Sequence, residues 1–347
     1  MEKLKIGVIF GGTSTEHDVS VVSGTSVIKN LDKNKYEIYP IYISETGEWY
    51  EYKFEGKIYK IGEKIKGISK IKNICEYLKN LNKVFPVLHG IGGEDGSIQG
   101  LLELLKIPYV GSKILSSSLC MDKAYAKIIF EKANIMQAKY IYIKKTGNDY
   151  IFVNEDFTEE ITNLKEIVKK INKKIEFPIF VKPSNSGSSV GINKVNNTDE
   201  LIEAIEYASS FDSKILVEEN IIGREIECAV LGNEDVHASI LGEIIAADKF
   251  YSFDAKYKNN ESKTIMPALI DKELSEKIRK IAIKAYKAAD CKGLSRVDFF
   301  VDEKNEKIYL NEINTLPGFT EISMYPKLWE KTGILYTELL DKLIDLA

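Results

Sequence analysis

The N-terminal third of the chain repeats an order of apolar run, glycine-containing turn and helix-like segment, which restricts the folds open to it. The apolar runs are residues 5–10, 36–44 and 83–90, and glycine-rich turns follow the first and the third. Strands that alternate with helices favour an open, mostly parallel sheet. Residues 45–75 are polar and aromatic without a clear period, so we expect hairpins or irregular structure there.

Beyond residue 116 the pattern changes to paired apolar runs separated by loops and amphipathic segments. Predicted helices span residues 117–135, 198–209, 275–290 and 333–347. Predicted strands span residues 177–183, 190–195, 215–220, 224–232, 296–302 and 307–314. This mixture is typical of α+β structure, and a third region begins near residue 210.

The composition excludes several classes of protein. Apolar residues make up 44% and charged residues 29% of the 347-residue chain, as in globular proteins. A formal net charge of -4 gives no reason to expect a nucleic-acid partner. No apolar run approaches the ~18 residues of a membrane helix. Four scattered cysteines without a C-x-x-C motif suggest buried thiols in a cytoplasmic protein.

The predicted hairpin at residues 296–314 concentrates charge on one face. If its turn centres on Asn305, Asp298 lies opposite Glu312 and Arg296 lies opposite Asn314. Like charges directly opposite each other destabilise a sheet, so this face requires a compensating partner. The residues alone leave two hypotheses open: a Mg²⁺ or Mn²⁺ site built of oxygen ligands, or a salt bridge in which Arg296 joins the acids.

Two candidates follow strands of the N-terminal sheet. Glu16 fits a capping box with Thr13, which is a structural role. Alternatively, its turn lies at the carboxyl end of a strand, where open α/β sheets bind ligands, and Glu16 receives a cationic amine there. His89 ends another strand and either faces the same crevice or is a packed histidine.

Glycines, serines and a lysine make residues 181–191, VKPSNSGSSVG, a candidate phosphate loop, although the stretch matches neither standard nucleotide fingerprint. Lys182 ends an apolar strand and requires solvent or an anion. Lys123 looks like a surface lysine, with Lys127 one helical turn later. The long connection at 246–265 is either a binding loop or a surface loop without a role.

Taken together, the motifs resemble the D-alanine–D-alanine ligase family of the ATP-grasp superfamily. The motifs run from residue 10 to residue 326 and occur in the order GGTSTEHDVS, HGIGGEDGSIQGLLE, CMDKAYAK, VKPSNSGSSVG, DAKY, SRVDFF and NEINTLPGFTEISMYP. The resemblance implies an N-terminal substrate-binding domain at 1–115, followed by ATP-grasp subdomains at 116–208 and 209–347 with a lid loop at 247–263.

The resemblance also implies a function. Two D-alanine molecules are joined at the expense of ATP, through an acyl phosphate, for peptidoglycan precursor synthesis. The family implies a homodimer and two Mg²⁺ ions, with Mn²⁺ as an alternative. The metal ligands implied are Asp298, Glu312 and Asn314. The ATP-binding residues implied are Lys123, Lys182, Ser188, Glu218, Ile221, Glu225, Phe250 and Lys256.

Further roles follow from the same resemblance. Ser188, Tyr257 and Glu16 lock the lid, and backbone donors around Gly318 hold an oxyanion. The substrate-binding residues implied are Glu16, His89, Arg296, Ser323 and Met324, of which Met324 makes a backbone contact. Ser186 and the pair at 219–220 depart from residues common in the family, so no role is assigned to Ser186.

Three alternatives stay open on the sequence alone. A sister ligase takes D-serine or D-lactate as second substrate, although Tyr257 in the lid favours D-alanine over D-lactate. Another ATP-grasp ligase would lack the two N-terminal motifs. A nucleotide-binding regulatory protein would have no need of the intact set of Arg296, Asp298, Glu312 and Asn314.

Overall fold

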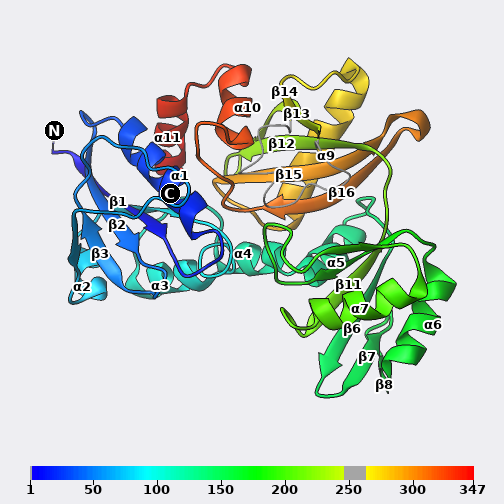
Figure 1. The fold of residues 1–347 in the computed structure, drawn as a ribbon. Coiled ribbons are helices and arrows are strands. Elements are labelled where there is room, and N and C mark those ends of the chain that lie inside the picture. Colours follow the sequence, from blue (N-terminus) through cyan, green and yellow to red (C-terminus); the bar gives the residue numbers. More distant parts are fainter. Residues whose placement is uncertain (1, 246–262) are drawn as a thin grey trace.

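The N-terminal region forms a five-stranded sheet in the order β4-β3-β2-β1-β5. Its strands β1, β2 and β3 are labelled in Figure 1. The computed structural model describes residues 2–245 and 263–347. β1, β2 and β5 are parallel, whereas β3 and β4 are antiparallel additions at one edge, so the predicted mostly parallel sheet is confirmed. The strands are β1 (Leu4–Gly11), β2 (Tyr36–Ile43), β3 (Trp49–Tyr52), β4 (Ile68–Lys70) and β5 (Lys83–Leu88). The helices are α1 (His17–Asn30), α2 (Ile74–Lys79) and α3 (Ser97–Leu105).

The turn after β1 depends on a glycine. Gly11 has a φ of +93°, and a Cβ there would lie 2.1 Å from the carbonyl oxygen of Ile43. Only glycine tolerates both the backbone conformation and the close approach. This turn fixes the direction in which the chain leaves β1, and Glu16 then lies directly before α1.

The second sheet has six strands in the order β10-β9-β11-β6-β7-β8. Its strands are β6 (Tyr140–Thr146), β7 (Asp149–Val153), β8 (Glu159–Thr162), β9 (Ile179–Pro183), β10 (Asn193–Val195) and β11 (Lys214–Glu219). Its helices are α4 (Ile114–Met121), α5 (Lys123–Lys132), α6 (Leu164–Lys174) and α7 (Thr198–Ala208).

Two expectations for this region are corrected. The single helix predicted at 117–135 is two helices, because Asp122 has extended backbone and its carboxylate caps α5 by accepting from the backbone N–H groups of Ala124 and Tyr125. β11 pairs with β9 and β6 of the second sheet, although the predicted boundary at 208 assigned it to the third domain. The meander β6-β7-β8 was not predicted.

The third sheet has the order β14-β13-β12-β15-β16. Its strands are β12 (Arg224–Leu231), β13 (His237–Ile245), β14 (Lys263–Ile265), β15 (Leu294–Asp302) and β16 (Lys307–Asn314), with a 3-10 turn η1 (Glu303–Asn305). Its helices are α9 (Lys272–Ala288), α10 (Met324–Thr332) and α11 (Tyr336–Asp345). α10 was not predicted. None of the helices in the described part of the chain has the length and apolarity to span a bilayer.

In the β15–β16 hairpin the residue pairs far from the turn are those predicted, although the pairs near the turn are not. Near the turn Phe299 pairs with Leu310, one residue out of the predicted register. A bulge after Asp298 restores the register, so that Asp298 pairs with Glu312 and Arg296 with Asn314.

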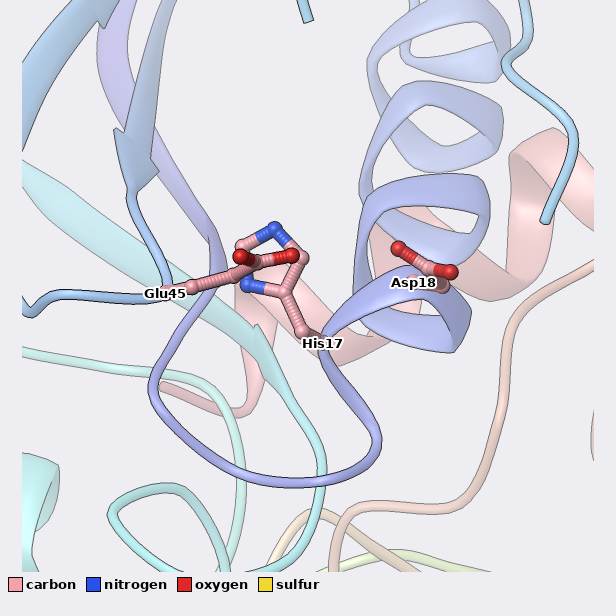
Figure 2. A group of neighbouring side chains, drawn as sticks. All are labelled: His17, Asp18 and Glu45. Atoms are coloured by element: carbon pink, nitrogen blue, oxygen red, sulfur yellow. The ribbon is translucent and has the colours of Figure 1, made fainter. Parts of the chain in front are cut away.

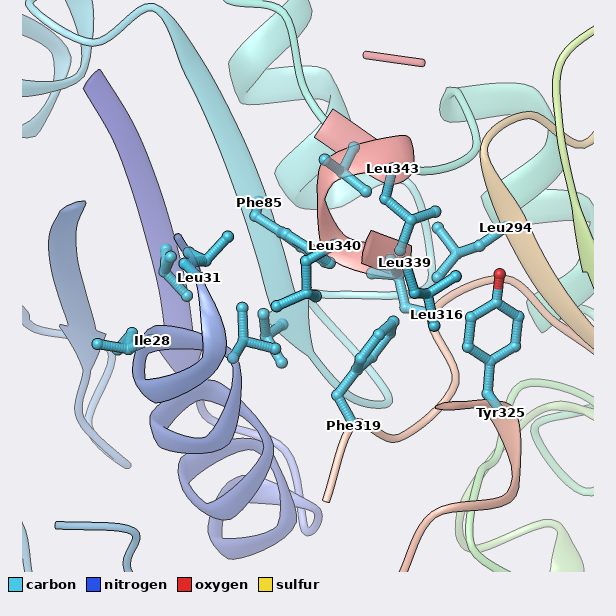
Figure 3. Packing of buried hydrophobic residues seen from close by; sticks show 14 of the residues in the cluster. Ile28, Leu31, Phe85, Leu294, Leu316, Phe319, Tyr325, Leu339, Leu340 and Leu343 are labelled. Carbon is cyan, nitrogen blue, oxygen red and sulfur yellow. The ribbon is translucent and has the colours of Figure 1, made fainter. Parts of the chain in front are cut away.

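The largest apolar core joins the two ends of the chain. Phe85 of β5 and Leu31 after α1 belong to the same buried cluster as Leu339 and Leu340 of α11, and Phe319 lies between them (Figure 3). α11 consequently packs on the N-terminal sheet rather than only on its own region.

Candidate active site

A cavity of about 400 Å³ is lined by residues of all three sheets and their connections. Every sequence-predicted site residue that the structure describes lines it: Glu16, His89, Lys123, Lys182, Ser188, Glu218, Ile221, Glu225, Arg296, Asp298, Glu312, Asn314, Gly318, Ser323 and Met324. Phe250, Lys256 and Tyr257, with nearly all of the predicted lid, lie outside the described residues. Residues from distant parts of the sequence therefore share one enclosed space.

One wall is a group that we call the hairpin cluster: Glu227, Arg296, Asp298, Glu312 and Asn314. Arg296 donates two hydrogen bonds to Asp298, at 2.8 and 2.7 Å, and its Nε lies 3.2 Å from a Glu227 carboxylate oxygen. Burial lowers the pKa of Arg296, but Asp298 and Glu227 outweigh it and hold the pKa well above the usual value. The salt bridge considered from the sequence is thus formed.

The donor set of the hairpin cluster also fits a hard cation. Asp298 lies directly opposite Glu312 on β16 and opposite Glu227 on β12. Three carboxylates outnumber the single guanidinium, although Lys123 lies 3.6 Å from Glu312. Carboxylate and amide oxygens without thiolate or imidazole suit Mg²⁺ or Mn²⁺.

Another part of the cavity wall is a group that we call the lysine cluster: Lys127, Lys182 and Glu218. The Lys182 ammonium donates to Glu218 Oε2 at 2.7 Å, and the Lys127 ammonium lies 3.4 Å from Glu218 Oε1. Burial alone raises the pKa of Glu218, but Lys127 and Lys182 together lower it to about 2. This wall holds two cations for one anion.

The loop between β9 and β10 closes one side of the cavity. Ser188 and Ser189 have positive φ angles of 49° and 61°, so the loop turns sharply there. A Cβ on Gly187 would lie 2.6 Å from Glu16 Oε1, which shows that the loop touches the N-terminal region. Lys123 donates to the carbonyl oxygen of Ser186 at 2.6 Å. Ser186, left without a role from the sequence, thereby anchors the loop to α5.

The side chain of Glu16 does not cap α1. Glu16 occupies the N-cap position itself, and its side chain makes no capping hydrogen bond. The capping box with Thr13 is therefore wrong, because α1 begins at His17, directly after Glu16, rather than at Ser14, directly after Thr13. The Glu16 carboxylate lies instead beside Gly90 and Gly187.

His89 connects the N-terminal sheet to the loop that follows β16. Its Nδ1 lies 3.1 Å from the Leu316 carbonyl oxygen, and its Nε2 lies 3.1 Å from Ser23 Oγ. Since a carbonyl only accepts, Nδ1 carries the proton and Nε2 accepts from Ser23. Ser23 Oγ accepts in turn from the Phe319 N–H at 3.2 Å. Burial lowers the pKa of His89, which favours this neutral form.

The same loop places Gly318 against Ser323. A Cβ on Gly318 would lie 2.8 Å from Ser323 Oγ, so a side chain at residue 318 would displace that hydroxyl. Ser323 Oγ accepts from the Thr320 N–H at 3.0 Å. Ser323 also precedes α10, whose first turn begins at Met324 in the cavity wall.

The cavity residues that were missed from the sequence include three buried charged ones: Glu94, Lys127 and Glu227. Glu227 follows Glu225 by two residues on one strand, and Lys127 follows Lys123 by one helical turn. Residues at these spacings share a face of the strand or helix, so the positions of Glu225 and Lys123 could have indicated both. Glu94 lies in the glycine-rich turn after His89. Burial and then the negative charge of Glu16 raise its pKa well above the usual value.

A second group of polar side chains lies beside the turn after β1: His17, Asp18 and Glu45 (Figure 2). Their possible ligand atoms lie within 4.8 Å of one another. His17 Nδ1 bonds to the Gly12 carbonyl at 2.5 Å, its Nε2 lies 3.2 Å from the Tyr42 hydroxyl, and Asp18 accepts from the Gly62 N–H. These existing partners account for His17 and Asp18 without an ion.

Family comparisons agree with this architecture. The model described as D-ala D-ala ligase N-terminus matches residues 5–112, and the model described as D-ala D-ala ligase C-terminus matches residues 132–345. The chain is 50% identical to D-alanine–D-alanine ligase of Clostridium acetobutylicum over 99% of its length and 98% of the relative. It is 48% identical to that of Acetivibrio thermocellus, covering 100% of this chain and 96% of the relative.

Solved structures show the same fold. VanG D-Ala:D-Ser ligase from Enterococcus faecalis is 39% identical with a TM-score of 0.85, and the match covers 99% of each chain. D-alanine–D-alanine ligase from Bacillus anthracis, complexed with ATP, is 33% identical with a TM-score of 0.75, covering 99% of this chain and 97% of that one. The three-sheet fold and its shared cavity define an ATP-grasp enzyme. Within that class, the chain belongs to the D-alanine–D-alanine ligase family.

Proposed function

We propose that this protein joins two D-alanine molecules to D-alanyl-D-alanine at the expense of ATP, for peptidoglycan precursor synthesis. The observation that carries the proposal is the single cavity that unites an acid-rich wall, a lysine-rich wall and the Glu16 turn. A triphosphate and a divalent cation need walls of opposite charge, and an amino acid needs a carboxylate for its amine.

ATP is assigned to the lysine-rich side. Lys182 and Lys123 supply charge for phosphates, and the loop carrying Ser188 covers them. Glu218, Ile221 and Glu225 follow one another along β11 and into β12, where they would hold the base and the ribose. Phe250 and Lys256 complete this assignment from the sequence.

The hairpin cluster is assigned the metal. Asp298, Glu312 and Asn314 would hold two Mg²⁺ ions, or Mn²⁺, and the ions would neutralise charge on the phosphates. Arg296 is held by Asp298 and Glu227, so its guanidinium is a fixed positive charge toward the reacting carboxylate.

The substrate residues divide between the two amino acids. Glu16 receives the amine of the first D-alanine, near His89. Ser323 and the start of α10 at Met324 receive the carboxylate of the second, since a helix N-terminus favours an anion. The backbone N–H groups around Gly318 face the oxyanion, and His89 fixes the loop that carries them.

The chemistry needs ATP because a carboxylate is a poor electrophile toward an amine. The carboxylate of the first D-alanine attacks the γ-phosphorus of ATP, and ADP leaves as the acyl phosphate forms. The amine of the second D-alanine then attacks the acyl carbon, phosphate leaves, and the amine loses a proton. Acyl phosphates hydrolyse readily, so the lid at 247–263, with Tyr257 linked to Ser188 and Glu16, is assigned the exclusion of water.

D-Serine as second substrate is the other candidate, because the similar fold of VanG is that of a D-Ala:D-Ser ligase. We also propose a cytoplasmic homodimer, on the strength of the family alone. The test mixes enzyme, ATP and Mg²⁺ with D-alanine, D-serine and D-lactate, and measures ADP and products. We expect ADP with D-alanyl-D-alanine as the main product. Mainly mixed dipeptide or depsipeptide would contradict the D-alanine assignment, and absence of ADP would contradict ligation.

A further inference from the structure

Lys127 is a buried lysine to which the proposed reaction gives no role. It lies on α5 and is 3% exposed, and its ammonium lines the cavity beside Glu218. The distance to Glu218 Oε1 is 3.4 Å, and among the described residues no atom completes a hydrogen bond to the Lys127 ammonium. A buried ammonium in this state is costly, so its retention needs a reason.

The position of Lys127 is set by helix packing. Ala124, one turn earlier on α5, packs against Leu216 of β11 in a small buried cluster. Residues three or four apart share a helix face, so Lys127 faces β11 as well and meets Glu218 two residues beyond Leu216. It cannot turn into solvent without leaving this face.

Lys182 differs from Lys127 in being more exposed to the cavity and to solvent. It lies on the neighbouring strand β9, and its side chain is 13% exposed against 4% for that of Lys127. Its ammonium now bonds to Glu218 at 2.7 Å. Transfer of Lys182 to a phosphate would break that bond, and a buried carboxylate left without a cation is strongly unfavourable.

We propose that Lys127 is a positioning residue for ATP: it is the permanent counter-ion of Glu218 and leaves Lys182 able to transfer to a phosphate. The inference rests on the proposed ATP site. Within that site, Lys127 is the fixed cation, Glu218 is the anion, and Lys182 is the cation that exchanges between Glu218 and a phosphate.

The test compares ATP with adenosine, which lacks phosphates, by calorimetric titration in the absence of amino acids. Lys127→Met should weaken ATP binding about tenfold or more, because Lys182 stays on Glu218, and change adenosine binding less than about twofold. Lys132→Met is the matched control, since Lys132 is an exposed lysine on the same helix and should change neither affinity. Equal losses for ATP and adenosine would overturn the proposal, as would no loss for either.

A double variant separates this role from a merely structural one. In Glu218→Gln, Lys182 has no carboxylate to leave, so adding Lys127→Met should change ATP affinity less than about twofold. A further loss specific to ATP would overturn the proposal, because Lys127 would then act on the phosphates itself. The comparison of Glu218→Gln with the double variant tests the proposal even if Lys127→Met alone does not fold. Wild-type protein that bound neither ATP nor adenosine would instead contradict the proposed function.

Discussion

The hairpin cluster and the lysine cluster face the same cavity but balance their charges in opposite ways. The hairpin cluster has three carboxylates around one guanidinium, and the lysine cluster has two ammonium groups around one carboxylate. Arg296 bridges two of the carboxylates, Glu227 and Asp298, and Glu218 bridges the two ammonium groups. The hairpin cluster therefore has an excess of negative charge and suits a cation, whereas the lysine cluster has an excess of positive charge and suits an anion.

The largest expected effect comes from removing charge on the acid-rich wall. Glu312→Gln should lower turnover about 1000-fold, because a neutral amide binds a divalent cation weakly and several kcal/mol of stabilisation are lost. ADP release at saturating substrates measures this. Glu306→Gln, exposed at the turn of the same hairpin, is the control and should have turnover near wild type. Near-normal turnover of Glu312→Gln at ordinary Mg²⁺ concentrations would contradict a metal site in the hairpin cluster.

On the other wall, the pKa of Glu218 predicts a pH dependence of stability. Its pKa falls from 4.5 to about 2 on folding, so the stabilisation is complete above pH 4.5 and is lost as the pH drops through about 2. The contribution is roughly 3 kcal/mol. Denaturant unfolding between pH 5 and pH 2 should show a steeper loss for wild type than for Glu218→Gln. Equal slopes would mean that the lysines do not hold this carboxylate ionised.

Arg296→Lys tests whether the fixed guanidinium matters beyond its charge. Lysine cannot form the paired hydrogen bonds to Asp298, so its ammonium would not be held in place. We expect turnover to fall by about tenfold to a hundredfold with little change in nucleotide affinity. Arg279→Lys, at an arginine that bonds to backbone carbonyls away from the cavity, is the matched control. An equal effect of both substitutions would point to general destabilisation.

The smallest effect is expected for Lys182→Met. Loss of one charged hydrogen bond to a phosphate should raise the KM for ATP about tenfold and change kcat less. Steady-state kinetics with varied ATP measure this, and the exposed Lys165→Met is the control. If the KM for D-alanine rose instead of the KM for ATP, Lys182 would belong to the D-alanine site rather than to the ATP site.

The acid-rich wall was largely predictable and the lysine-rich wall was not. Strand period places Asp298 opposite Glu312 from the sequence alone, and the predicted register holds because a bulge offsets a tighter turn. The pairing of Lys127 with Glu218 depends on how α5 packs against β11, which no local pattern encodes. The meander β6-β7-β8 was missed as well, and only β8, which has four mostly exposed residues, is a short strand.

The packing of α11 on the N-terminal sheet has a consequence for biosynthesis. Lys83 of β5 donates to the carbonyl oxygen of Ile344, and Leu339 and Leu343 fill the core beside Phe85 (Figure 3). The N-terminal region therefore lacks part of its core until α11 has been translated. Until then the apolar surface that α11 covers is exposed, and exposed apolar surface favours aggregation of a partly synthesised chain.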